Sequence, residues 1–145
     1  MSESSGYGEN SQAVQAHLGI VQSVIQRMSA NSTSCKTWCI TLVSAILVVV
    51  ANEEKPQYAL IAVVPTVLFF ALDIYYLILE KRFRNSYNTF IDKLHDNEVQ
   101  TSDVYAVTPS GSRGKAFLSA VCSFSTWPFY LTLLAMIGLA IKYVI

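Results

Sequence analysis

The stretch Tyr58–Leu79, YALIAVVPTVLFFALDIYYLIL, decides the fold of this chain. It is apolar apart from one acid, Asp73, and it is long enough for a helix that crosses the hydrocarbon core of a bilayer. Pro65 is tolerated within such a helix at the expense of a kink. The apolar run ends at Glu80, so the sequence predicts a transmembrane span over about 58–79.

Two further apolar stretches accompany this span. Cys35–Ala51 is near the lower length limit for crossing a bilayer, and Lys36 and Trp38 near its start suit an interfacial position. The polar sequence Asn52–Gln57 makes a tight connection to the next span. A third span is predicted at 128–144, because a proline at its start is favourable in the first turn of a helix.

The composition agrees with a membrane protein. Hydrophobic residues make up 52% and charged residues 14% of the 145 residues, against roughly 45–50% and about 25% in soluble domains. Ten basic and ten acidic residues cancel, so no net field recruits nucleic acid. His17 and His95 lack metal-ligand or nucleophile partners, and the three cysteines are interpreted as small buried hydrophobes. We expect no enzyme activity and no cofactor.

The N-terminal part is predicted to be a separate unit. Residues 1–10 are expected to be a disordered, cytoplasmic lead, and residues 11–34 an amphipathic helix that ends near Asn31–Ser32. Packing against this chain or another copy is favoured over binding to the membrane surface, because Arg27 is the helix's one positive charge. As a seam between copies we predict an apolar stripe at helical spacing: Val14, Leu18, Val21, Ile25 and Met28.

The basic residues set the orientation. Eight of the ten lie before or at the start of the first span, as Arg27 and Lys36 do, or in the segment 80–115, and only Lys55 and Lys142 lie elsewhere. By the positive-inside rule the N-terminus and the segment 80–115 are cytoplasmic. The predicted protein is therefore multi-pass, with a transmembrane domain over residues 35–145. The segment is predicted to begin as a helical extension of the second span and to continue, from Asn97 to Arg113, as a flexible loop.

Asp73 is the most informative single residue. Thr66, Asp73, Glu80 and Tyr87 recur every seven residues and form a polar line along the predicted helix. One hypothesis is that this line faces water or ions in a pore of several copies, since one chain has too few helices to surround a pore. The alternative is that Asp73 pairs with Lys36, Arg27 or a tyrosine hydroxyl as an assembly clamp. The sequence slightly favours the clamp.

Several basic residues are candidates for anion contact. The run Lys81-Arg82-Phe83-Arg84 follows the second span and favours attraction of anionic lipid over a phosphate-bearing ligand. The loop Ser110–Lys115, which includes Arg113, superficially suggests an anion cradle. It lacks the spacing of a nucleotide-binding P-loop, because only two residues separate its glycines.

Three stretches, His17–Ser32, Leu72–Asn88 and Ser125–Leu134, resemble a family of small three-helix bacterial membrane proteins. Some similar proteins are membrane effectors beside nucleotidyltransferases in anti-phage defence operons, the Hailong-type channel effectors among them. The resemblance covers most of Ala16–Tyr143. It draws attention to the following residues, for pore lining, assembly or ligand contact: Asp73, Tyr76, Glu80, Arg84 and Tyr87, with Arg27 and Asn31.

The resemblance implies an all-α, homo-oligomeric ion channel of the bacterial inner membrane, with a tetramer favoured. It further implies control by a nucleotide or oligonucleotide from a partner nucleotidyltransferase, and antiviral defence by depolarising the membrane. The alternative from a different class is a membrane anchor or assembly subunit whose cytoplasmic helices dock a partner protein.

Overall fold

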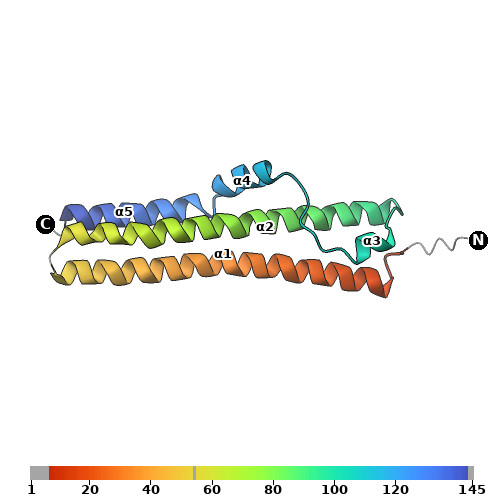
Figure 1. Cartoon of the computed structure of the whole chain (residues 1–145), viewed down its shortest axis with the longest axis horizontal. Helices are drawn as coiled ribbons and strands as arrows, with labels where there is room; N and C mark the ends of the chain where they lie inside the picture. Colours follow the sequence, from red (N-terminus) through yellow and green to blue (C-terminus); the bar gives the residue numbers. More distant parts are fainter. Residues whose placement is uncertain (1–6, 54, 144–145) are drawn as a thin grey trace, which may run out of the picture.

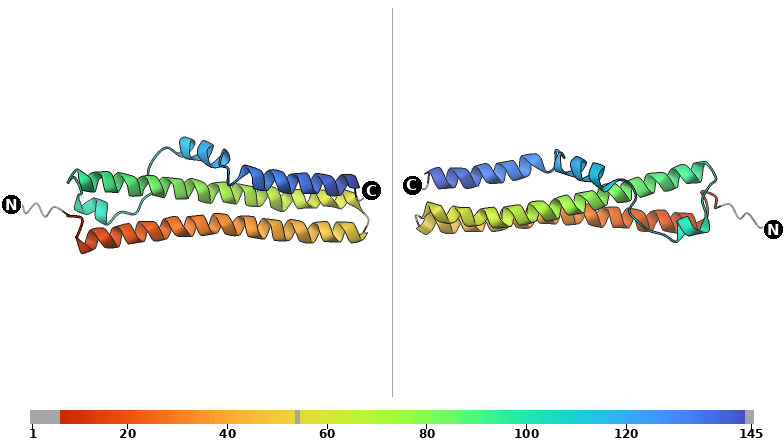
Figure 2. Two further views of the ribbon diagram at one scale, coloured as in Figure 1. Left: turned by 180° about the vertical axis from the view of Figure 1, so that it is seen from behind. Right: turned by 45° about the horizontal axis from the view of Figure 1, so that its top comes forward.

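The computed structural model describes residues 7–53 and 55–143, and these form helices and connecting turns without strands. A long hairpin dominates the fold (Figure 1). Its first arm is α1 (Gln12–Glu53), and its second arm is the 3₁₀ helix η1 (Pro56–Ala62) followed by α2 (Val63–His95). The left view in Figure 2 shows α1 and α2 side by side along their length, and the two helices are in contact.

Three shorter helices complete the chain. After α2 the chain forms one turn, α3 (Thr101–Val104), and returns along the hairpin to α4 (Arg113–Val121). The last helix, α5 (Trp127–Tyr143), runs beside η1 and the N-terminal part of α2 (Figure 1). The all-helical prediction is confirmed. The helix α5 lies close to the predicted third span, of which Val144 is outside the described residues.

The predicted separation of an N-terminal amphipathic helix from the first span is wrong, because α1 continues without a break through Asn31–Ser32. Free serine and threonine hydroxyls end helices by competing for backbone groups. Here Ser32 donates its hydroxyl to Asp73 instead, and Thr33 and Thr37 bond back to the carbonyls of Ser29 and Thr33. The chain therefore has no boundary at residue 34. Of the predicted disordered lead, residues 1–6 lie outside the described residues.

Three prolines occupy helix starts, the first being Pro56, which begins η1. Pro65 stands in the first turn of α2, where its missing N–H is not needed, and the residues before it form η1. The second apolar stretch is therefore two helices in series rather than one kinked helix. Pro128 likewise follows Trp127 in the first turn of α5, as its position in the sequence predicts.

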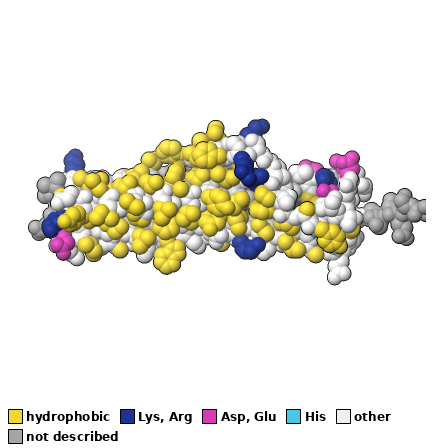
Figure 3. Space-filling view, in the orientation of Figure 1, with side chains coloured by type: hydrophobic (Ala, Val, Ile, Leu, Met, Phe, Trp, Pro, Cys, Tyr) yellow, Lys and Arg dark blue, Asp and Glu magenta, His cyan; other side chains and the backbone are white. Residues whose placement is uncertain are grey.

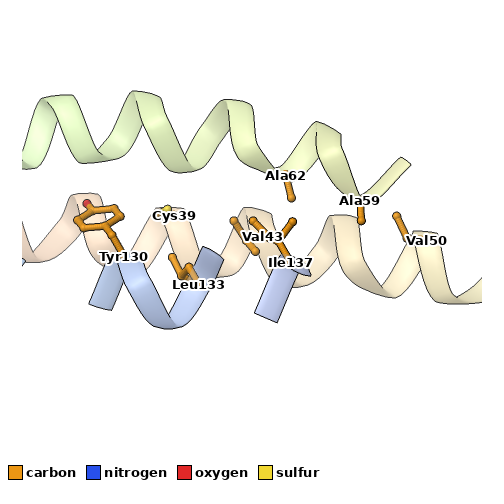
Figure 4. Close-up of a cluster of buried hydrophobic side chains, with 8 residues drawn as sticks. All are labelled: Cys39, Val43, Val50, Ala59, Ala62, Tyr130, Leu133 and Ile137. Atoms are coloured by element: carbon orange, nitrogen blue, oxygen red, sulfur yellow. The ribbon is translucent and has the colours of Figure 1, made fainter. Parts of the chain in front are cut away.

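The main hydrophobic core lies where three helical segments meet (Figure 4). Cys39, Val43 and Val50 of α1 face Ala59 and Ala62 of η1, with α5 closing the third side. The small alanines let the backbone of η1 come near α1, which large side chains would prevent. The α5 residues that complete this core are Tyr130, Leu133 and Ile137. Cys35 and Cys39 are buried as expected, whereas Cys122 is exposed.

Much of the surface around this core is apolar (Figure 3). Two helical segments, Gln12–Glu53 and Pro56–His95, are long and apolar enough to cross a membrane, and α5 is a shorter apolar helix. Val48, Val64 and Leu68 are each more than half exposed. A soluble monomer rarely exposes so large a patch, so this surface suits a lipid environment or further copies of the chain.

The predicted flexible loop 97–113 is more ordered than expected. It contains α3, and its later part lies against α2, where the Ser110 N–H donates to the Arg82 carbonyl at 3.3 Å. Ser86 donates its hydroxyl to the Thr108 carbonyl at 2.9 Å. These contacts bring the loop Ser110–Lys115 to the basic turn at the end of the apolar part of α2.

Candidate functional site

An ion pair between the two arms of the hairpin is the first candidate site. Asp73 of α2 has no exposed surface, and its Oδ2 lies 2.7 Å from Nζ of Lys36 on α1. The Ser32 hydroxyl donates to Asp73 Oδ1 at 2.5 Å, and Lys36 Nζ donates to Ser32 Oγ at 3.3 Å. Ser32 and Lys36 are four residues apart, so both side chains reach the same point from one face of α1.

This geometry distinguishes the two hypotheses for Asp73. An acid that lines a water-filled pore must expose its carboxylate, whereas Asp73 is enclosed by its own chain and paired with Lys36. Burying both charges costs desolvation energy that the pair and the Ser32 hydrogen bond offset. Asp73 is therefore a clamp within the hairpin, with Lys36 rather than Arg27 as its partner.

The other residues of the predicted polar line also make contacts within the chain. Thr66 is buried and donates to the Ala62 carbonyl at 2.8 Å. Glu80 pairs with Arg84 one turn later at 2.9 Å, and Tyr87 accepts a hydrogen bond from Gln22 of α1 at 3.5 Å. Tyr76 is half-buried beside the Tyr75 ring. The line follows the inner side of the hairpin rather than an open surface.

The apolar stripe predicted as a seam between copies is instead used inside the chain. Val14 and Val21 are buried, and Val14 packs with Phe90, Leu94 and Val104. Leu18, Ile25 and Met28 are half-buried. The sequence correctly indicated a packing face, but the structure places the chain's own α2 against it, because α1 and α2 both extend well beyond the apolar segments.

A polar surface that faces away from the core is the second candidate site. Thr33, Thr37, Thr41 and Ser44 are exposed and lie on one side of α1, opposite Ser32, Cys35, Cys39 and Val43. We call these four residues the hydroxyl face. Thr37 and Thr41 donate to the carbonyls four residues earlier, at 3.2 and 2.8 Å, which leaves their oxygens as acceptors at the surface.

The structure brings together only some of the residues that were predicted to contact a ligand or lipid. Lys81, Arg82 and Lys115 line one cavity together with Asn85 and the loop around Gly111. The remaining members of the predicted set are not among its lining residues: Arg27, Asn31, Arg84 and Arg113. The loop 110–115 and the basic run 81–84 are 26 to 34 residues apart in the sequence, so their proximity could not be predicted from spacing alone.

The far end of the hairpin has a polar cluster that the sequence did not indicate. His17 is buried, stacks on Phe90 with ring centroids 4.4 Å apart, and has Nδ1 2.8 Å from the Val104 carbonyl. A carbonyl only accepts, so Nδ1 carries the proton and donates it. The lone histidine is thus a structural residue that fastens α3 to α1.

The adjacent ion pair joins α2 to α3. Lys93 Nζ lies 2.8 Å from Asp103 Oδ1, and the Gln100 N–H donates to Asp103 Oδ2 at 3.1 Å. The hydrogen bond from Lys93, followed by that from the Gln100 backbone, holds the pKa of the Asp103 carboxyl below its ordinary value.

A carboxyl whose pKa is lower in the folded protein than in the unfolded chain stabilises the fold at pH values above its unfolded pKa of about 4. This contribution is lost as the pH falls through the lower pKa of the folded protein. Asp103→Asn should therefore lower the thermal unfolding midpoint at pH 6, and the gap to wild type should close below about pH 4. Unfolding curves in detergent at several pH values measure this. Asp92→Asn, an exposed acid of α2, is the control; an equal, pH-independent gap in both variants contradicts a role for the pair.

No group of three or more histidine, cysteine, aspartate or glutamate side chains is arranged to hold a metal ion within residues 7–53 and 55–143. No family model, no curated protein and no solved structure matches this chain. The function proposed below therefore depends on the sequence and the geometry of the described residues.

Proposed function

We propose that the chain is one subunit of a homo-oligomeric membrane channel, with about three spans, its N-terminus and the segment 80–115 in the cytoplasm and its C-terminus outside. The two long apolar helices and the 17-residue α5 support the span count. Lys55 lies over the Tyr58 ring and Lys142 over the Tyr143 ring, as expected for cations that reach out to one interface. Trp38 and Trp127 are exposed and suit the opposite interface.

The observation that carries the proposal is the hydroxyl face of α1. In hydrocarbon a polar face is most favourable against another helix or water. The contacts within one chain leave this face uncovered, because η1, α2 and α5 occupy the opposite side of α1. Several copies arranged with their hydroxyl faces inward would make a closed ring around a polar passage.

The biological setting follows from the sequence resemblance. A channel of this kind would serve as a bacterial inner-membrane effector in anti-phage defence, controlled by a nucleotide or oligonucleotide product, and its opening would depolarise the cell. A tetramer is the favoured assembly. Since Asp73 is enclosed, its role would be to stabilise each subunit. The passage would be lined by α1.

Ion flux from liposomes tests the proposal. Purified protein reconstituted into vesicles loaded with potassium should release it when a potential is applied, while protein-free vesicles should not. The protein should also have the mass of an oligomer in detergent. A monodisperse, correctly inserted protein that releases no ions either with or without added nucleotides favours the alternative, a membrane anchor that docks a cytoplasmic partner.

A further inference from the structure

A cavity of about 350 Å³ lies between α2 and the N-terminal end of α4. We call it the basic cradle and define it by Lys81, Arg82 and Lys115, with the hydroxyls of Ser110, Ser112 and Ser119 at its wall. Every charged residue that lines it is basic. In the described part of the chain, none of these three cations forms a salt bridge.

Hydrogen bonds from α2 side chains hold the loop of the cradle in place. Asn85 donates to the Ser110 hydroxyl at 2.8 Å, and Arg82 Nη2 donates to the Pro109 carbonyl at 3.1 Å. Gly111 turns the chain with a φ of +87°, and a Cβ there would lie only 3.1 Å from the Asn85 amide. The loop is thus fixed against α2 before any ligand arrives.

Several donors remain for an anion. Arg82 Nε is buried and has no hydrogen-bond partner among the described residues. Lys81 gives two hydrogen bonds to Ser119, which leaves one of its three donors. The Ser112 side chain does not cap α4, so the first N–H groups of this nine-residue helix are also free of a side-chain cap. Cationic and backbone donors of this kind bind phosphate oxygens.

The surroundings of the cradle indicate where that phosphate comes from. The apolar run ends at Leu79, and Lys81 and Arg82 follow it after the single residue Glu80. On α4, Ala116 and Ala120 are buried while Phe117 and Leu118 are half or more exposed, and Phe124, just beyond the helix, is 90% exposed. A basic pocket with an exposed apolar flank matches a lipid, whose headgroup and acyl chains are joined.

We propose that the basic cradle binds the phosphate of an anionic phospholipid headgroup from the cytoplasmic leaflet, with the acyl chains along α4. Bound there, the lipid would fasten α4 to α2 at the edge of the membrane. If the whole basic run attracted anionic lipid diffusely, Arg84 would contribute as much as Lys81 and Arg82. Arg84 does not line the cradle, however, and it is already paired with Glu80. Arg84 therefore provides a matched control one turn from the site.

The experiment measures binding of phosphatidylglycerol to the full chain in a neutral detergent by native mass spectrometry. Phosphatidylcholine, a zwitterion without net charge, is the comparison. Arg82→Gln and Lys115→Gln should each weaken phosphatidylglycerol binding about fivefold, while Arg84→Gln should leave it near wild type. Lys115 is exposed, so its variant tests the site even where Arg82→Gln does not fold.

Three results would overturn the proposal. Equal losses in Arg84→Gln and Lys115→Gln would mean diffuse attraction, and equal binding of the two lipids would mean that the cradle has no preference for an anionic headgroup. Millimolar inorganic phosphate should not displace the lipid, because it lacks the acyl chains that contact α4. Complete displacement by phosphate would assign the cradle to a soluble phosphate compound instead.

Discussion

Asp73→Asn is expected to lower the stability of the protein by about 3 kcal/mol, because it leaves the Lys36 ammonium largely buried without its counter-ion. Asparagine preserves the shape of the side chain and still accepts a hydrogen bond from Ser32, so the loss reports the charge. Chemical unfolding in detergent, followed by far-ultraviolet circular dichroism, measures it. Asp73→Leu should cost more, since it also strands the Ser32 hydroxyl.

The rescue variants identify the partner. Lys36→Gln combined with Asp73→Asn should recover much of the lost stability, because a neutral pair leaves no isolated charge. Arg27→Gln combined with Asp73→Asn should recover none, as Arg27 is exposed on α1 and forms no hydrogen bond or salt bridge with Asp73. Unchanged stability in Asp73→Asn, or rescue by Arg27→Gln, would contradict the clamp.

Val21→Glu is expected to lower the free energy of unfolding by on the order of 4 kcal/mol. The variant places a charge without a partner at a position that is 2% exposed. The part of the hairpin beyond the apolar segments should open, since α1 and α2 pack there through this face. Limited proteolysis, with cleavage sites located by mass spectrometry, should show new cleavage between residues 12 and 30 and in the C-terminal part of α2. Ala16→Glu, at an exposed position of the same helix, should cause little change.

The two interpretations of the stripe give different outcomes for this variant. If the stripe packs within the chain, Val21→Glu opens the hairpin while the apolar segments keep the oligomer together in detergent. If the stripe is a seam between copies, the oligomer dissociates into monomers that resist protease as wild type does. The second outcome would contradict the packing described here.

The helical elements were predictable from the sequence because apolar runs and prolines mark them. Tyr58–Leu79 identified the second arm of the hairpin, and Pro128 marked the start of α5 to within one residue. The continuity of α1 was not predictable. Asn31–Ser32 has the composition of a helix end, and only the tertiary bond from Ser32 to Asp73 shows why the helix continues.

The candidate sites, like the helices, were predictable only in part. The sequence identified Asp73 as a group that must face protein or water and named Lys36 among its partners, because an acid in an apolar helix has few alternatives. It assigned the stripe around Val21 to another copy, since nothing in the pattern distinguishes an intrachain partner from a second chain. The basic cradle joins Lys81 to Lys115 through a loop whose course depends on hydrogen bonds to α2, such as Asn85 to Ser110.

Thiol modification of the hydroxyl face during ion flux tests the proposed channel most directly. Thr41→Cys and Leu42→Cys are made with Cys122→Ser, because Cys122 is exposed whereas Cys35 and Cys39 are buried. Both positions are exposed in one chain, but Leu42 lies on a different side of α1. A cationic methanethiosulfonate reagent should suppress flux through the Thr41→Cys channel and leave the Leu42→Cys channel unchanged. Flux that is absent throughout, or that both variants lose equally, would contradict a passage lined by α1.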